Sequence, residues 1–424
     1  MQTRIVLIGA GSAMFGLGAL GDIFKCKALE GSEVVLNDIN PDALREVDSL
    51  AQQFIQEHSL PYTVSATTEL EEALQGASFC MISIEVGDRH KLWQQDWKMP
   101  LQYGIRQVYG ENGGPGGLFH SLRIIPPILD ICEAINRICP EAYVFNLSNP
   151  LPRICLAVQR KFPNLRMVGL CHEVVSLPDH LPAILDTPLS NLSITAGGLN
   201  HFSVLLKVAY KDTGKDAYPD VREKAPAYFA KLPQRTLFQE ILKYFDYLPI
   251  TVDSHFGEYV HWAHEVADHK GIIDYYDYYS TFGFYQGPPM GRIEEGTRPE
   301  EYWRVIPIIE GIVTDSHHTE LAVDIPNDGL ITNLPEDLVV EVPATVDKEG
   351  IHGVKVGKLP KAIAGLMNHQ AIVQDMVADA ALSGSRHTVM QALLLDPVVD
   401  TVRGAEKLLD AMIDLQRPYL DYLK

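Results

Sequence analysis

The sequence predicts an α/β protein in which a doubly wound parallel sheet is followed by an α+β domain. Short apolar runs alternate with amphipathic helical stretches over residues 4–150, which is the rhythm of a doubly wound sheet. This alternation ends near residue 190, and longer strand-like runs follow it. Because the 424 residues suggest two domains, we expect them at 1–190 and 191–424.

The first half of the chain is expected to alternate strands with helices. Residues 4–9 form an apolar run rich in β-branched residues, which is typical of a strand covered on both faces. A helix is expected at 15–28, and a second strand at 32–38. Pro41 then marks the start of another helix, because proline is favoured in the first helical turn. The same pattern predicts strands at 62–68, 79–87 and 143–150, and helices at 69–75 and 118–137.

The second half is more mixed. Residues 192–210 predict a pair of longer strands with a Gly-Gly break, and residues 338–357 predict another hairpin. The aromatic, Gly/Pro-rich stretch 274–292 fits a lid, a subunit contact or an irregular loop. Residues 360–423 are expected to be mostly helical.

Composition and charge narrow the possible partners. The net charge of −20 argues against nucleic acid, whose phosphates need a basic surface. No apolar run is long enough to span a membrane, and the start of the chain does not resemble a secretory signal. The six cysteines lie within the first 171 residues without the spacing of a disulfide framework. We therefore expect reduced thiols in a cytoplasmic protein.

The segment IGAGSAMFG predicts a Rossmann-like dinucleotide site. Gly9 permits the tight turn after the first strand, and Gly11 permits close approach of the backbone to a pyrophosphate. Met14 stands in place of the third glycine of the usual motif. Asp38 ends the next strand, where a carboxylate can accept both ribose hydroxyls and repel a 2′-phosphate. We expect NAD rather than NADP, although a turn without ligand is the alternative. The expected cofactor-binding residues are Gly9, Gly11, Ser12 and Asp38.

Four further motifs are expected to meet at the carboxyl edge of the sheet, where ligands of open α/β folds bind. They are YGENGGPGG (109–117), NLSNP (146–150), GLCHEV (169–174) and GLNHF (198–202). With these motifs in this order, essentially the whole chain resembles glycoside hydrolase family 4, the NAD- and divalent-metal-dependent glycosidases. The Cys-His-Glu-Val tetrapeptide is most similar to the subgroup that acts on α-galacturonides. Phospho-glycosidases of the family carry an aspartate where this chain has His172.

The resemblance implies a lactate/malate dehydrogenase-like fold and a metal site. It implies that Cys171 and His201 bind the metal, usually Mn²⁺, and these residue types suit such an ion. Without a metal, they would be a buried thiol and a core histidine. Asn149 would bind substrate hydroxyls beside the nicotinamide, or it is only the turn former of its Asn-Pro pair.

The resemblance also implies the reaction. NAD⁺ takes hydride from C3 of the sugar, and the metal polarises the resulting ketone. A base removes the C2 proton, the leaving group departs, water adds at C1, and the ketone is reduced again. No net oxidation results.

Acid and base roles follow from matching positions. His172 stands at the position of the leaving-group acid, and Glu173 would share that role or bind substrate. Glu111 matches a glutamate that raises the basicity of the base. His255 and Tyr259 are candidates for the base, and we favour His255.

The predicted substrate is an α-galacturonide, whose carboxylate needs a cationic partner such as Arg89, Arg106 or Arg292. An α-glucosidase or α-galactosidase of the same family is the alternative. From other classes come an NAD-dependent 2-hydroxy-acid dehydrogenase and an NAD-sensing binding protein. We expect a homodimer or homotetramer, and we expect His261, His264 and His269 to form an exposed helical face rather than a second metal site.

Overall fold

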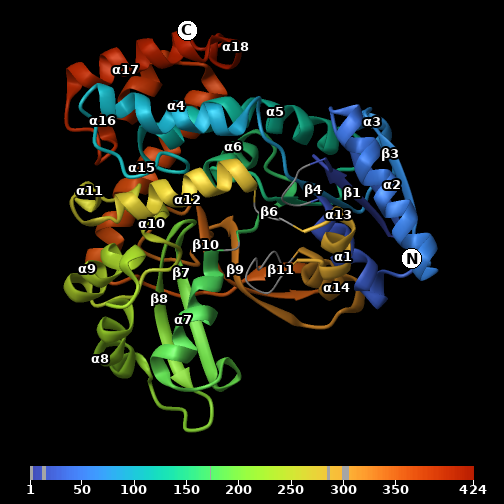
Figure 1. Ribbon diagram of the computed structural model, residues 1–424, viewed down its shortest axis with the longest axis horizontal. Coiled ribbons are helices and arrows are strands. Elements are labelled where there is room, and N and C mark those ends of the chain that lie inside the picture. Colours follow the sequence, from blue (N-terminus) through green and yellow to red (C-terminus); the bar gives the residue numbers. More distant parts are fainter. Residues whose placement is uncertain (1–2, 12–15, 172, 284–286, 298–304) are drawn as a thin grey trace.

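The computed structural model describes residues 3–11, 16–171, 173–283, 287–297 and 305–424. Within these residues one eleven-stranded sheet crosses the molecule in the order β3-β2-β1-β4-β5-β6-β9-β10-β7-β8, with β11 beside β10 (Figure 1).

The first six strands form a parallel sheet, of which the first five were predicted from the sequence and β6 was not. Their order, 3-2-1-4-5-6, is that of two mononucleotide-binding halves joined at β1 and β4. Side chains of β1 alternate between two buried clusters, with Val6 and Ile8 in one and Ile5 and Leu7 in the other. A strand buried on both faces needs this continuous apolar run, so the predicted Rossmann-like fold is confirmed. The strands are β1 (Arg4–Ile8), β2 (Glu33–Asn37), β3 (Thr63–Thr67), β4 (Phe79–Ile82), β5 (Tyr143–Asn146) and β6 (Arg166–Gly169).

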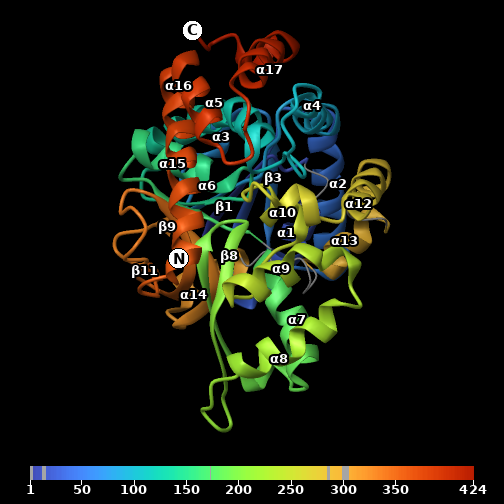
Figure 2. The ribbon, with the colours of Figure 1, turned by 90° about the vertical axis from the view of Figure 1, so that its left-hand side faces the viewer.

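Helices cover both faces of this sheet (Figures 1 and 2). Their buried residues divide between the same two clusters. One face carries α1 (Gly16–Lys25), α2 (Pro41–His58), α13 (Pro289–Glu295) and α14 (Val305–Thr314). The other carries α3 (Leu70–Ala73), α5 (Gly114–Ile138), α6 (Leu151–Lys161) and α15 (Lys361–Ser383).

The second half of the chain extends the sheet with antiparallel strands. The two predicted hairpins are present as β7–β8 and β10–β11. The strand β9, which the sequence analysis did not predict, pairs with β6 through Gly169 and Asp324. The predicted domains therefore share one sheet, and their boundary stays a prediction. The added strands are β7 (Leu192–Leu199), β8 (Phe202–Tyr210), β9 (His318–Pro326), β10 (Val339–Asp347) and β11 (Gly350–Gly353).

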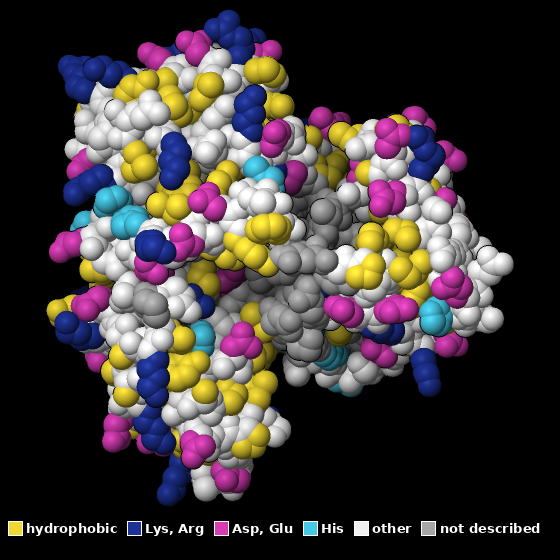
Figure 3. Space-filling view, in the orientation of Figure 1, with side chains coloured by type: hydrophobic (Ala, Val, Ile, Leu, Met, Phe, Trp, Pro, Cys, Tyr) yellow, Lys and Arg dark blue, Asp and Glu magenta, His cyan; other side chains and the backbone are white. Residues whose placement is uncertain are grey.

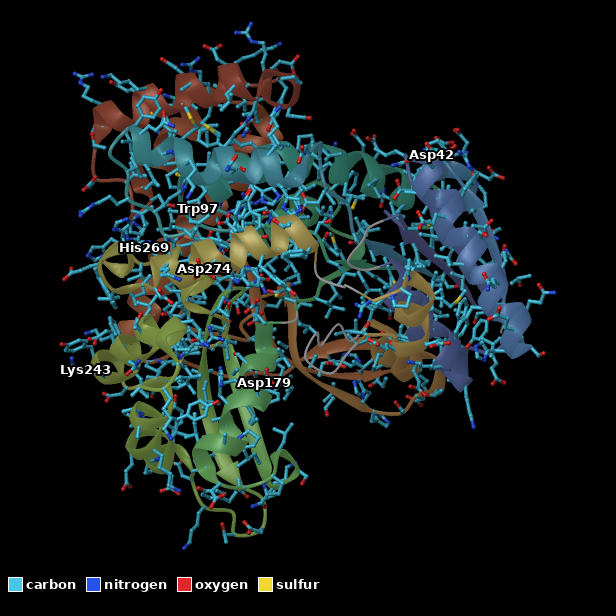
Figure 4. All side chains as sticks on the ribbon, viewed as in Figure 1. Asp42, Trp97, Asp179, Lys243, His269 and Asp274 are labelled. Atoms are coloured by element: carbon cyan, nitrogen blue, oxygen red, sulfur yellow. The ribbon has the colours of Figure 1, made fainter. Side chains whose placement is uncertain are left out.

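The aromatic stretch 274–292 is helical over much of its length, so the irregular-loop alternative is wrong there. Its first part belongs to α12 (His269–Phe282), whose first turn is capped by Asp268. The helix lies along α4 (Arg89–Gln102), as Trp97 and Asp274 mark in Figure 4. Residues 284–286 of this stretch lie outside the described part of the chain.

Shorter helices complete the molecule. No helix among the described residues is long and apolar enough to cross a membrane. The three histidines expected on one helical face are instead spread over a turn, α11 and the start of α12. These helices are α7 (Ser176–Leu185), α8 (Tyr218–Phe229), α9 (Thr236–Phe245), α10 (Asp253–Gly257), α11 (Ala263–Val266), α16 (Arg386–Leu395), α17 (Val402–Leu415) and α18 (Arg417–Leu420).

Candidate active site

A cavity of about 870 Å³ opens at the carboxyl ends of the parallel strands. This is the edge at which open α/β sheets bind their ligands. The turns after β1, β2, β4, β5 and β6 all contribute to its wall. Of the predicted site residues, Gly9, Gly11, Asp38, Glu111, Asn149, Cys171, Glu173, His201 and His255 line it. Ser12 and His172 lie outside the described residues.

One end of the cavity has the geometry of a dinucleotide site. Gly9 has a φ of +86°, and a Cβ there would lie 2.0 Å from the carbonyl oxygen of Ser83. Gly11 donates its N–H to Asp38 Oδ2 at 2.8 Å, and Asn40 donates to Oδ1 at 2.8 Å. These bonds fix the carboxylate at the end of β2, beside the 92% exposed Ile39. The residues present therefore fit a dinucleotide with an apolar contact for its base.

Cys171 and His201 come together as predicted for metal ligands. Cys171 follows β6, and His201 lies in the turn between β7 and β8 with a φ of +61°. Their Sγ and Nε2 atoms are 3.1 Å apart. In addition, possible ligand atoms of Glu173, His201 and His255 lie within 4.8 Å of one another. Thiol, imidazole and carboxylate donors on one side of a cavity suit a divalent transition metal with open positions for substrate.

His255 is held between two carboxylates. Its Nε2 is 3.1 Å from Glu111 Oε2, and its Nδ1 is 3.4 Å from Glu173 Oε1. Burial lowers the pKa of His255, but the charge of Glu173 and the hydrogen bond to Glu111 outweigh it and raise this pKa well above its usual value. A carboxylate that stabilises the imidazolium form makes the histidine a stronger base.

Glu111 is kept ionised by its neighbours. Burial raises its pKa, but the hydrogen bond to His255 and the charge of Arg89 bring it down to about 2. Arg89 Nη2 donates to Glu111 Oε1 at 2.6 Å, and Nη1 pairs with Glu85. A chain of ion pairs therefore runs from Glu85 through Arg89 and Glu111 to His255. It places the negative charge of Glu111 beside the imidazole.

The structure separates the two candidates for the base. His255 lines the cavity, whereas Tyr259 is 2% exposed and packs against Phe202 with ring centroids 5.0 Å apart. Tyr259 is not among the described lining residues. Asn149 lines the cavity, and within the described structure its buried Oδ1 has no hydrogen-bond partner. An amide oriented in this way suits a ligand hydroxyl.

The three arginines considered for a substrate carboxylate lie in different environments. Arg89 lines the cavity but is already paired with Glu85 and Glu111. Arg106 is exposed and Arg292 is buried against α1, and neither is among the described lining residues. The geometry therefore does not support Arg106 or Arg292 as the partner of a substrate carboxylate.

Glu258, a fully buried carboxylate behind the site, was not predicted from the sequence. It accepts hydrogen bonds from the backbone N–H groups of Glu111, Asn112 and Gly113. Burial raises its pKa to about 7. Glu258 thereby fixes the loop that carries Glu111. A glutamate three residues after His255, within an apolar segment, was the signal available in the sequence.

Comparisons with known proteins agree with this geometry. Residues 4–187 match "Family 4 glycosyl hydrolase", and residues 196–399 match "Family 4 glycosyl hydrolase C-terminal domain". An α-glucosidase of Erwinia rhapontici is 52% identical, with all of both chains covered. An α-galacturonidase of Thermoanaerobacterium saccharolyticum is 28% identical over 98% of this chain and 96% of the relative.

Solved structures show the same fold. A 6-phospho-α-glucosidase from gut microorganisms, in complex with NAD and Mn²⁺, has a TM-score of 0.82 at 20% identity, with all of both chains covered. Malate dehydrogenase of Plasmodium falciparum has a TM-score of 0.53 at 14% identity and covers 90% of this chain and 99% of its own. The predicted dehydrogenase-like architecture is thus confirmed.

Proposed function

The chain belongs to family 4 of the glycosyl hydrolases. We propose that it uses NAD and a divalent metal to hydrolyse α-glucosides, in which the sugar that is released from the glycosidic bond is uncharged. The family, and with it the glycosidase activity, was predicted from the sequence motifs and is confirmed by these matches. The observation that carries the sugar preference is the 52% identity to an α-glucosidase over the whole length of both chains.

The two cofactors are assigned to the two ends of the cavity. NAD would lie on the turn of Gly9 and Gly11 with its ribose at Asp38, and Mn²⁺ would bind Cys171 and His201. A solved structure of the same fold contains NAD and Mn²⁺, which supports both assignments. Together the two cofactors would take up and return a hydride at C3 and make the C2 proton acidic.

The protein groups supply the proton transfers. In its neutral form His255 would accept the C2 proton, and Glu111 and Glu173 would stabilise the imidazolium that forms. Arg89 would keep Glu111 ionised during this step. Asn149 would hold a sugar hydroxyl with its unpartnered Oδ1. The role of His172 as leaving-group acid stays a prediction.

The charges in the cavity favour a neutral sugar over a galacturonide. A uronate carboxylate needs a cation that is not already neutralised. The arginines among the described lining residues are Arg89 and Arg123, and both are paired with carboxylates, Arg123 with Asp96. Among the described lining residues, an arginine for a uronate carboxylate becomes available only if one of these pairs opens, which costs the buried carboxylate its partner.

A panel of p-nitrophenyl glycosides tests the sugar preference. With NAD⁺, Mn²⁺ and a reducing agent, we expect kcat/KM to be highest for the α-glucoside. The α-galacturonide should be at least about tenfold poorer, because the arginines among the described lining residues are already paired with carboxylates. The α-galactoside is the matched control, because it is uncharged and differs from the α-glucoside in the configuration of its C4 hydroxyl. A higher kcat/KM for the galacturonide would overturn this proposal and support the galacturonidase prediction. Reducing agent is required because the six cysteines are free thiols.

A cytoplasmic location and a homodimeric or homotetrameric state stay predictions. The oligomeric state is measurable by light scattering of the purified enzyme.

A further inference from the structure

One aromatic side chain of α12 stands at the mouth of the cavity. Tyr275 and Tyr279 line the cavity together with Glu111, Glu173 and His255. Tyr275 is 52% exposed, whereas Tyr279 is 8% exposed. Tyr275 therefore borders both solvent and the proposed catalytic groups, and Tyr279 lies deeper in the wall. In Figure 3 hydrophobic side chains gather over α12 on this face of the molecule.

The ring of Tyr275 packs beside a second aromatic ring of α12. It lies parallel to the ring of Tyr279, with centroids 6.2 Å apart and an interplanar angle of 2°. Tyr279 packs edge-on against His90 and Trp93 of α4. Between them on α12, Tyr276 donates its hydroxyl to the carbonyl oxygen of His90 at 2.9 Å. These contacts fix α12 to α4, so the backbone that carries Tyr275 is held against α4 beside the cavity.

The hydroxyl of Tyr275 stays protonated in the cavity wall. Burial and the charges of Glu111 and Glu173 raise the pKa of this hydroxyl, so it remains a hydrogen-bond donor. The ring thus belongs to the same cavity wall as these carboxylates and is half exposed to solvent. A substrate whose glycosidic bond lies at His255 would place its second sugar in this zone, where the cavity opens.

From this arrangement we propose that Tyr275 forms the subsite for the leaving-group sugar and binds a neutral pyranose ring by stacking. The proposal rests on the proposed glycosidase function and adds the residue that selects the leaving group. The C–H groups on the apolar face of a pyranose carry a slight positive charge, and they match the electron-rich face of an aromatic ring. An aromatic ring in this position strengthens the binding of a substrate whose leaving group is a sugar. It does not affect the binding of a substrate with a small leaving group.

Two substrates with the same glucosyl group and different leaving groups test this subsite. α-Glucosyl fluoride has no leaving-group ring, whereas maltose carries a second glucose. In the Tyr275→Ala holoenzyme, the ratio of kcat/KM for maltose to that for the fluoride should fall about tenfold, mainly through KM. Tyr275→Phe keeps the ring and should keep most of the ratio.

Tyr278 is the matched control on the same helix. It is also 52% exposed, but it is not among the described residues that line the cavity. Tyr278→Ala should leave both substrates unchanged. An unaltered ratio in Tyr275→Ala, or an equal drop in Tyr278→Ala, would overturn the subsite. If the unmodified enzyme hydrolysed neither substrate, the proposed α-glucosidase function itself would be wrong and the subsite would fall with it.

Discussion

Replacing His201 with alanine is expected to abolish glycosidase activity and to weaken Mn²⁺ binding by about a hundredfold or more. His201 Nε2 lies 3.1 Å from Cys171 Sγ, so both side chains face one position. A catalytic metal has few protein ligands, and the loss of one removes a large share of its affinity. A titration with Mn²⁺ measures this loss directly when the free ion is monitored by its electron paramagnetic resonance signal. NAD affinity should change little.

His180→Ala is the matched control for that experiment. His180 is half-buried and hydrogen-bonded to Tyr228, but it is not among the described lining residues. Its removal should reduce stability without changing Mn²⁺ affinity. Cys171→Ser should behave like His201→Ala. Full turnover by either site variant after exhaustive chelation would show that the assigned pair does not bind the metal.

Replacing Gly9 with alanine is expected to raise the dissociation constant of NAD by about a hundredfold or more, equivalent to about 3 kcal/mol. The new methyl group would lie 2.0 Å from the carbonyl oxygen of Ser83, which is far inside contact distance. Since that oxygen belongs to the backbone after β4, the turn itself must move. Displacement of this turn would move Gly11, whose backbone the pyrophosphate would approach. Fluorescence titration with NAD measures the effect, and a thermal melt verifies that the variant folds.

Gly31→Ala separates backbone strain from the clash. Gly31 has nearly the same φ, +84°, but nothing lies within 4 Å of the position its Cβ would take. This variant should lose about 1 kcal/mol of stability through the left-handed conformation while binding NAD normally. If Gly9→Ala bound NAD as well as Gly31→Ala does, the turn would not be the cofactor site.

The parallel half of the fold was predictable because its signals are local. The apolar run of β1 reflects burial on both faces, and Gly9 marks the turn that must follow it. The strand β9 was missed because its sequence, HTELAVDIP, mixes charged and apolar residues. Its buried Asp324 pairs with Gly169 of β6, far away in the chain. Such pairing depends on tertiary context that no local pattern contains.

Some residues of the candidate site were likewise predictable from local sequence, and others were not. Cys171, His201 and Asn149 belong to short motifs, so their positions were predictable from sequence alone. Glu258 was missed because its partners are the backbone N–H groups of a loop 147 residues earlier in the chain. The pairing of Arg89 with Glu111 was missed because these side chains come from different elements, and it changes the interpretation of Arg89 from a substrate ligand to a support for Glu111.

Hydrolysis in deuterated water distinguishes the proposed removal and return of hydrogen at C3 and C2 from other routes. The C2 proton would leave to His255, which lies in a cavity open to solvent. With NAD⁺ and Mn²⁺, the released sugar should therefore carry deuterium at C2, seen by NMR at early times, and NADH should not accumulate. A product that keeps only hydrogen at C2, or net formation of NADH as in a 2-hydroxy-acid dehydrogenase, would contradict the account.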